Sequence, residues 1–341
     1  MVGGRRHWWK VAASLALAAG LLAWFLSRVP LADVGRTLAT VRLGWFGAAI
    51  VASLSSYALR ALRWRVILRP LGDAPTAELL GCTAAGFATS AILPARAGEL
   101  VRPLLLTART QLPAAGTVAS IVVERLADLA TVLLLFGVSA LLSRGTIAAG
   151  ALRPVRDAAV LALVGVAVVI VVVLLLLRRR EAAVRQLSRV FPGRLRPRGE
   201  RLLHHLLDGL EAVRDPGALA RLFAWSCAVW LASAVQVQWL ARAFGLDYSL
   251  PVSYVAMAVS GLGLAVPTPG GVGGFHAAIQ FALTSLLDVD LPTATAFALL
   301  HHVVCFVPIT VVGLSYIAAV GLSLSRVRAL EEASTPAIGE R

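Results

Sequence analysis

Long apolar stretches constrain this chain more than any other feature of its sequence. A helix needs about 20 mostly apolar residues to cross a bilayer, and six stretches meet that length: 10–27, 43–62, 116–142, 158–177, 219–243 and 293–322. Charged residues make up only 15% of the chain, against about 25% in soluble domains. The sequence therefore predicts an all-α polytopic membrane protein, with residues 1–341 forming a single integral membrane domain, and argues against a soluble enzyme or a disordered chain.

The net charge of +14 would suggest a nucleic-acid partner if the protein were soluble. Here the apolar spans separate the charges into loops, so we expect anionic membrane lipids as partners and no nucleic acid. The three cysteines, Cys82, Cys227 and Cys305, lie in apolar stretches without CxxC spacing. They predict neither a disulfide framework nor a metal site, and no cofactor is expected.

The distribution of basic residues predicts the orientation. The segment 178–214 carries ten arginines, which places it in the cytoplasm. Counting crossings from there puts both termini in the cytoplasm, with 23 basic residues inside and 6 outside. We expect a multi-pass protein of the bacterial plasma membrane, whose cytoplasmic loop 178–218 contains an amphipathic helix lying on the membrane surface.

Two further apolar regions, 79–93 and 252–287, are interrupted by proline and glycine. Both ends of the first region fall on the cytoplasmic side, and both ends of the second fall outside. Each region is therefore expected to be a re-entrant hairpin, and the two enter from opposite faces. The halves 1–157 and 158–341 then share one plan, with two spans, a hairpin and a further span. This is an inverted-topology repeat of the kind found in transporters.

Three charged residues follow the break in the first hairpin. Arg96, Glu99 and Arg102 are spaced i, i+3, i+6, so they share a face if the return segment is helical. Guanidinium groups are well suited to bidentate binding of phosphate. The spacing fits a phosphate-binding site and a solvated cytoplasmic loop equally well, and the re-entrant topology favours the binding site.

A second charged group, Glu124, Arg125 and Asp128, lies about nine residues into an apolar span. An unpaired charge at the bilayer centre costs about 2.5–3.5 kcal/mol on insertion scales. Pairing within the group leaves one net negative charge, which predicts an external partner, with Arg96 or Arg102 as the candidates. A structural clamp and a substrate or proton site both fit, and we favour the functional interpretation.

The tip of the second hairpin is a third candidate for anion binding. Gly270, Gly271 and Gly273 leave backbone N–H groups accessible at the start of a helix, and His276 follows. The alternative is a tight turn that requires glycine for packing. The adjacent pair His301-His302 points in two directions on a helix and is poorly placed for chelation, so no metal site is expected.

These three motifs together resemble the flippase-like family, the transmembrane region of lysylphosphatidylglycerol synthases. The matching segments are 94–102, 124–128 and 267–273, and the resemblance covers nearly the whole chain. It implies a helical membrane domain that moves, or helps to move, lipids or lipid-linked molecules between leaflets. The family often carries Glu shortly after the glycine-rich tip, where this chain has His276. Two-domain members add a soluble aminoacyl-transfer domain, which is absent from this chain, so lysyl transfer is not expected.

The favoured function is a flippase or transporter that moves an anionic phospholipid or lipid-linked intermediate. One alternative is an integral membrane enzyme with Glu99, Glu124 and Asp128 as acid–base candidates. Since no nucleophile or metal group accompanies these carboxylates, we expect no catalytic residues and no enzymatic activity. The other alternative is a non-catalytic membrane partner of a separately encoded lipid-modifying enzyme.

Overall fold

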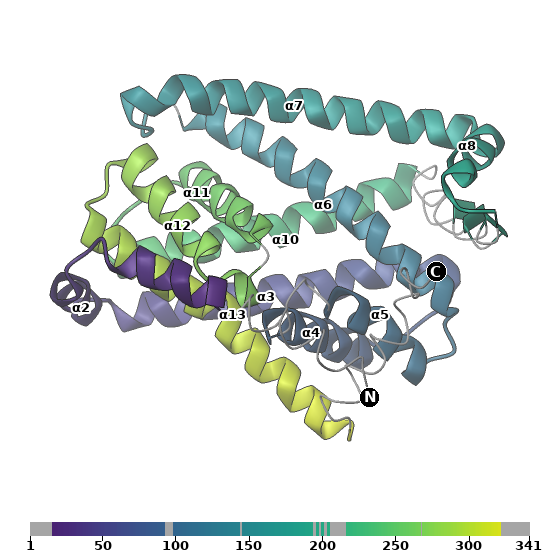
Figure 1. Ribbon diagram of the computed structural model, residues 1–341, viewed down its shortest axis with the longest axis horizontal. Coiled ribbons are helices and arrows are strands. Elements are labelled where there is room, and N and C mark those ends of the chain that lie inside the picture. The colour runs from purple at the N-terminus through teal and green to yellow at the C-terminus, as the bar shows by residue number, and fades with distance from the viewer. Residues whose placement is uncertain are drawn as a thin grey trace.

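The computed structural model describes residues 16–92, 98–143, 145–193, 196–197, 199–200, 203–204, 216–266 and 268–321. Every regular element among them is helical (Figure 1). The long helices are α3 (Leu43–Leu68), α6 (Ala114–Leu142), α7 (Ala149–Arg178), α10 (Pro216–Ala243) and α13 (Leu291–Ala319). The shorter helices are α2 (Leu31–Ala39), α4 (Thr76–Ile92), α5 (Gly98–Arg109), α8 (Arg180–Leu187), α11 (Leu250–Leu262) and α12 (Gly274–Phe281). Short turns of helix, η1 (Arg69–Leu71), η3 (Ser188–Val190), η5 (Gly263–Ala265), η6 (Pro269–Gly271) and η7 (Ala282–Leu286), extend or join them.

Capping residues and prolines set the starts of several helices. The Asp290 side chain accepts a hydrogen bond from the backbone N–H of Thr293 at 3.0 Å, and a proline occupies the first turn of α13. Pro113 precedes α6, and a proline also lies in the first turn of α11. Local sequence signals thus define the first residues of α6, α11 and α13.

Three helices of the described residues are long and apolar enough to cross a membrane: α3 extended by η1, α10, and α13. The helix Ala16–Leu26 and α2 would make a fourth span together, with a bend of 84° between them. Helices α6 and α7 are as long, but α6 carries three charged residues in its middle. The all-helical membrane character expected from the sequence holds, whereas the described residues contain three or four apolar spans rather than the six expected.

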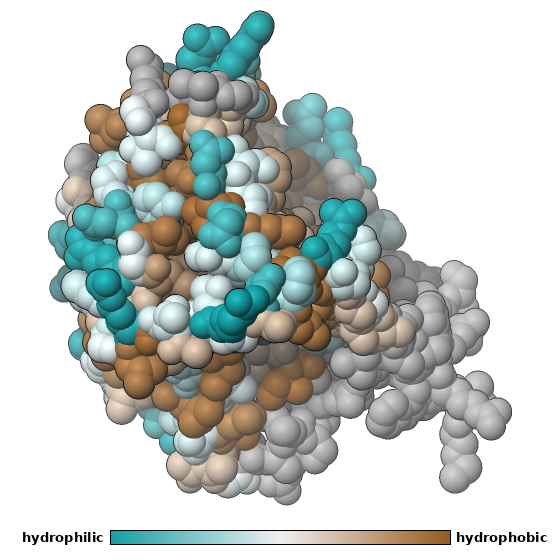
Figure 2. All heavy atoms as spheres, turned by 90° about the vertical axis from the view of Figure 1, so that its left-hand side faces the viewer, coloured by the Kyte–Doolittle hydropathy of each residue, from teal (hydrophilic) through white to brown (hydrophobic). Residues whose placement is uncertain are grey.

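The loops gather at two opposite ends of the molecule (Figure 1). At one end, backbone hydrogen bonds join segments far apart in the chain: Arg42 N–H donates to Ala243 C=O at 2.9 Å, and Ala148 N–H donates to Leu286 C=O at 2.8 Å. Figure 2 shows this end, where hydrophilic side chains are distributed among apolar ones. A bundle with its loops at two ends has the form of a membrane-spanning domain.

The helices pack in a pattern that occurs twice. Helix α3 packs against α10 at the centre; α4 packs against α13, and α11 packs against α6. Helix α5 contacts α6 as α12 contacts α13, and α7 lies on α6 as α2 lies on α13. Exchanging α2, α3, α4, α5 and α6 with α7, α10, α11, α12 and α13 therefore preserves these contacts. Apolar side chains of α10, α11 and α13 form one large core cluster, and those of α3, α4 and α5 form another.

Each of the two hairpins, α4–α5 and α11–α12, is held together by a facing pair of glycines. A Cβ atom on Gly98 would lie under 3.0 Å from the Gly86 carbonyl oxygen, and one on Gly274 would lie as close to the Gly263 carbonyl oxygen. Real Cβ atoms do not approach backbone so closely. The absence of a side chain is what allows the two helices of each hairpin to cross in backbone contact.

The tip of the second hairpin reaches the inner end of the first. A Cβ on Gly270 would lie 3.2 Å from the carbonyl oxygen of Ala91, which is in the last turn of α4. The turn of the first hairpin, 93–97, lies outside the described residues. The amphipathic helix expected within 178–218 also falls largely outside them, because 201–202 and 205–215 are not described.

Candidate functional site

Helices α3, α5 and α6 bring six charged side chains into one group, which we call the arginine cluster. Its cations are Arg60 and Arg63 of α3, Arg102 of α5 and Arg125 of α6, and its anions are Glu124 and Asp128 of α6. The spacings i, i+3 on α3 and i, i+4 on α6 place each pair on one face of its helix. Apart from Arg125, every member is at most 8% exposed.

Arg63 lies at the centre of the cluster and contacts both carboxylates. Its side chain is fully buried; Nη1 is 2.6 Å from Asp128 Oδ1, and Nη2 is 3.2 Å from Glu124 Oε1. The same Nη1 donates to Ser226 Oγ of α10 at 3.1 Å. Arg63 therefore connects the two central helices, α3 and α10, with α6.

Arg60 contacts the cluster from one turn earlier in α3. Its Nη1 is 3.7 Å from Asp128 Oδ2, and its guanidinium lies 4.7 Å from the ring centroid of Trp230 on α10. Trp230 also donates from its indole N–H to Asp128 Oδ1 at 3.0 Å. The ring of Phe87 on α4 lies 5.7 Å from the same guanidinium. Aromatic faces of this kind stabilise a buried cation.

Arg102 is buried, with part of its hydrogen-bonding capacity unused. Its Nη1 lies 3.0 Å and 2.9 Å from the two carboxylate oxygens of Glu124, and its guanidinium lies 3.8 Å from the ring centroid of Trp64. Among the residues that the structure describes, Nε and Nη2 of Arg102 have no hydrogen-bond partner. These two atoms form the edge that binds a phosphate or carboxylate in bidentate fashion. The pairing of Arg102 with Glu124 that the charge count predicted is present, whereas Arg96 lies outside the described residues.

Arg125 closes the cluster on its outer side. Its Nη2 is 3.0 Å from Glu124 Oε1 and 3.2 Å from Asp128 Oδ2, and its side chain is 42% exposed. Glu99 interacts electrostatically with Arg125, which brings a second residue of the first motif, besides Arg102, to the site. The sequence places Arg125 within an apolar span, yet it is the more exposed of the two arginines, since the side chain of Arg102 is only 5% exposed.

Positive charge is in excess in the cluster. Four guanidinium groups meet two carboxylates, and counting Glu99 they meet three. Burying a charge is costly unless it is paired and hydrogen-bonded. An anion that contacts the free edge of Arg102 would supply both the missing charge and the missing acceptors, and a phosphate fits this chemistry.

Arg60 and Arg63 were not identified from the sequence as site residues. Arginines at the end of an apolar span, followed by further basic residues, usually indicate a cytoplasmic boundary and not a binding site. The available signal was their i, i+3 spacing beside Trp64. Helix packing, which a single sequence does not define, is what turns them towards Glu124 and Asp128.

The glycine-rich tip adopts backbone conformations that favour glycine. Gly270, Gly271 and Gly273 have φ angles of 58°, 68° and 87°. In this conformation the N–H of Gly271 donates to Thr268 C=O at 3.0 Å, and the N–H of Gly273 donates to His276 Nδ1 at 3.3 Å. The tip thus satisfies these two donors internally, and His276 caps the N–H of Gly273.

Three histidines support the tip. His302 Nε2 lies 2.9 Å from the carbonyl oxygen of Gly270, and its ring stacks on that of His276 with centroids 4.6 Å apart. His301 is buried beside Phe275, with ring centroids 4.8 Å apart. Among the described residues, no group of three or more His, Cys, Asp or Glu is arranged to hold a metal ion.

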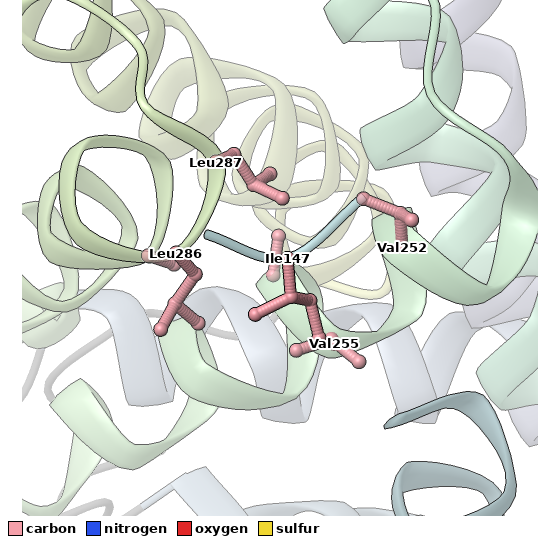
Figure 3. Close-up of a pocket in the computed structure, with 7 residues that line it drawn as sticks. Ile147, Val252, Val255, Leu286 and Leu287 are labelled. Carbon is pink, nitrogen blue, oxygen red and sulfur yellow. The ribbon is translucent and has the colours of Figure 1, made fainter. Parts of the chain in front are cut away.

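A small apolar pocket lies at the base of the second hairpin, away from the arginine cluster (Figure 3). Its lining includes Ile147, Val252, Val255, Leu286 and Leu287, all of them apolar. It offers no donor to an anion, so it is not a headgroup site.

Comparison with known proteins finds one relative and one family model that each cover most of the chain. The chain is 28% identical to a protein named glycosyltransferase AglD from Haloferax volcanii, over 96% of this chain and 59% of that protein. It therefore spans just under three fifths of that relative's length. The family model described as the lysylphosphatidylglycerol synthase TM region matches residues 11–313, including the three motifs that carry the resemblance. The chain belongs to the family of the lysylphosphatidylglycerol synthase transmembrane region.

Proposed function

We propose that this protein binds the phosphate of an anionic lipid at the arginine cluster and moves that lipid between the leaflets of the membrane. The observation that carries the proposal is the free edge of Arg102. This buried guanidinium holds Glu124 through Nη1, while its Nε and Nη2 have no hydrogen-bond partner in the described part of the chain. Buried donors without acceptors are rare in proteins and point to a ligand.

The proposed topology has six crossings and two opposed re-entrant hairpins, with residues 1–157 and 158–341 as inverted repeats. The repeated packing pattern supports it, since α3, α4, α5 and α6 have their counterparts in α10, α11, α12 and α13. The facing glycine pairs, Gly86 with Gly98 and Gly263 with Gly274, support it independently. In inverted repeats, the broken helices meet near the midplane and line the substrate path. The contact between Gly270 and Ala91 agrees with this expectation.

Binding is favoured over catalysis by the state of the carboxylates. Glu124 lies within ion-pair distance of Arg63, Arg102 and Arg125, and Asp128 lies within that distance of Arg60, Arg63 and Arg125. A general acid or base needs a free oxygen within reach of its substrate. Carboxylates so heavily paired serve better to position the arginines and to weaken their hold on a phosphate, so that it can be released.

The lipid can be a phospholipid or a phosphate-linked glycolipid. The name of the Haloferax volcanii relative, a glycosyltransferase, favours including the second class. In both classes the cluster would contact the phosphate, which is their shared chemistry. A role as membrane partner of a separate lipid-modifying enzyme is compatible with the same site.

A translocation assay tests the proposal. The protein is reconstituted into vesicles that contain a fluorescent phosphatidylglycerol, and the outer leaflet is bleached with dithionite. We expect dithionite to bleach more label than the outer leaflet holds, because active protein carries labelled lipid from the inner leaflet to the outer one. Arg102→Lys keeps the charge and loses the bidentate edge, so translocation should fall strongly. Arg36→Gln, on an arginine whose side chain is 80% exposed on α2, is the matched control.

Equal translocation by the Arg102→Lys and unchanged proteins would remove Arg102 from the mechanism. Absence of translocation for both phosphatidylglycerol and a phosphate-linked glycolipid, by folded protein, would contradict the proposed function. Translocation of phosphatidylcholine at the same rate would show that the cluster does not select anionic lipids.

A further inference from the structure

The exposure of Arg125 sets it apart from the rest of the arginine cluster. Its side chain is 42% exposed, while those of Arg60, Arg63 and Arg102 are 9%, 0% and 5% exposed. The exposed guanidinium lies far from either end of α6. It is 11 residues from the first residue of the helix, about 16 Å at 1.5 Å per residue.

The surroundings of Arg125 on α6 are apolar and exposed. Val122 and Leu129 lie at i−3 and i+4, on the same face of the helix, and are 45% and 47% exposed. On a helix inside a membrane domain, large apolar side chains with this exposure face acyl chains. Arg125 is thus a cation on the lipid-facing side of α6, between the apolar side chains of Val122 and Leu129.

Arg125 and Arg102 bind the same oxygen. Glu124 Oε1 is 3.0 Å from Arg125 Nη2 and 3.0 Å from Arg102 Nη1. The exposed and the buried guanidinium are therefore adjacent, with one carboxylate between them. An anion that takes the place of Glu124 at Arg125 lies beside Arg102, whose Nε and Nη2 have no hydrogen-bond partner among the described residues.

We infer that an anionic phospholipid reaches the arginine cluster sideways from the bilayer, across the face of α6 marked by Val122 and Leu129, with Arg125 as the first residue to bind its phosphate. The phosphate exchanges with the carboxylates of Glu124 and Asp128 at Arg125, and no covalent step is involved. This inference rests on the proposed function for what happens next, namely transfer to Arg102, but the access route can be measured without translocation.

The experiment measures which lipid lies beside Arg125. Val122→Cys is labelled with bimane in a chain whose three native cysteines are replaced, and the protein is reconstituted with lipids brominated on their acyl chains. Brominated phosphatidylglycerol should quench more than brominated phosphatidylcholine. The expected enrichment is about fivefold, the factor that one arginine near anionic lipid provides. Arg125→Gln should abolish the difference, and Arg125→Lys, which keeps the charge, should retain it.

Two matched controls distinguish this site from general attraction of anionic lipid. A bimane at Leu161→Cys, a 72% exposed position on the lipid-facing side of α7, should be quenched equally by both lipids. Arg153→Gln removes an arginine whose side chain is 87% exposed and should leave the preference at position 122 unchanged. Excess inorganic phosphate should not compete, because the inferred ligand comes from the bilayer.

Equal quenching by the two lipids beside an intact Arg125 would overturn the inference. Competition by inorganic phosphate would also overturn it, by showing an aqueous source for the anion. If the preference is present but the protein moves no lipid in the dithionite assay, the proposed function fails while the access site stands. If lipid moves but Arg125→Gln changes neither readout, the access site fails while the function stands.

Discussion

At the scale of residues, the arginine cluster shows how ionised groups are accommodated in a very apolar chain. Each carboxylate is shared among several guanidiniums, and aromatic rings cover the cations that remain. Because the partners come from α3, α5 and α6, removing one residue leaves its neighbours in place with altered pairing. The effect of each removal on the stability of the fold then depends on how deeply the removed side chain is buried.

Loss of Arg63 should destabilise the fold more than loss of Arg125. Arg63 is fully buried between both carboxylates and Ser226, and breaking a buried pair costs about 3–5 kcal/mol. Arg125 lies at the edge of the cluster with its side chain 42% exposed, and without it Glu124 still has Arg63 and Arg102 as partners while Asp128 still has Arg60 and Arg63. We expect Arg63→Met to lower the apparent melting temperature in detergent strongly, with Arg125→Met close to the unchanged protein.

Intrinsic tryptophan fluorescence during heating is the measurement, because Trp64 and Trp230 line the cluster. Arg36→Met, on an exposed arginine, should have no effect and serves as the control. Equal losses for Arg63→Met and Arg125→Met would contradict the difference in burial. Retention of full stability by Arg63→Met would show that the cluster contributes nothing to the fold.

The sequence identified the acidic half of this site better than the basic half. Glu124 and Asp128 stand out because a carboxylate in the middle of an apolar span has no other explanation than pairing or function. Arg60 and Arg63 do not stand out, because arginine at the end of a span is the ordinary topology signal. Which face of α3 meets α6 is a property of packing that one sequence does not reveal.

At the scale of elements, the two hairpins depend on glycine for a reason other than the turn. The sequence indicated a tight, glycine-dependent turn at the tip of the second hairpin. In the structure, Gly270, Gly271 and Gly273 do have positive φ. Gly98 and Gly274 instead face a glycine of the opposing helix in backbone contact. Periodicity and composition indicate a turn, but they do not indicate which two backbones touch.

Alanine at the facing glycines should therefore separate the helices of each hairpin. Gly98→Ala and Gly274→Ala each place a methyl group under 3.0 Å from a carbonyl oxygen, and overpacking of this kind costs about 1–3 kcal/mol. Both variants should melt at lower temperature than the unchanged protein. Gly47→Ala in α3 is the control, because nothing lies within 4 Å of its Cβ position, and it should be neutral or stabilising by up to about 1 kcal/mol.

The paired result is informative because the two hairpins are proposed repeats. Similar losses for Gly98→Ala and Gly274→Ala would agree with equivalent roles. No loss in either, with Gly47→Ala also neutral, would mean that the helices shift to accept a methyl group and that the glycine pairs do not determine the crossing.

At the scale of the whole molecule, composition was sufficient to predict the class of the protein. It was not sufficient to predict how many times the chain crosses the membrane. The apolar content predicted a helical membrane domain, which the fold and the family both support. The count of crossings depends on α6 and α7 and on whether α4–α5 and α11–α12 return to the side they entered. Length alone does not decide this, because α4 with 17 residues is about 25 Å long, close to the thickness of the hydrocarbon core.

Cysteine labelling in intact cells tests the orientation. Arg153 and Asp73 lie at opposite ends of the bundle with side chains 87% and 79% exposed, and the basic bias assigns Arg153 to the outside and Asp73 to the cytoplasm. In a chain without native cysteines, Arg153→Cys should react with an impermeant maleimide and Asp73→Cys should react only after permeabilisation. The reverse pattern would invert the topology. Labelling of both positions in intact cells would show that they do not lie on opposite sides of the membrane.

The sequence separation within the arginine cluster also affects how the chain enters the membrane. Arg63 and Asp128 are 65 residues apart, so at about 5–20 residues per second the ribosome takes about 3–13 s to synthesise the segment between them. During that interval α3 carries the cluster's Arg60 and Arg63 and lacks the carboxylates that neutralise them. Because an unpaired arginine at mid-bilayer is costly, we expect the end of α3 to wait at the cytoplasmic interface and to reach its final depth only when α6 arrives. Insertion of α3 and assembly of the cluster would then be a single event during synthesis, a timing that arrested nascent chains of increasing length measure directly.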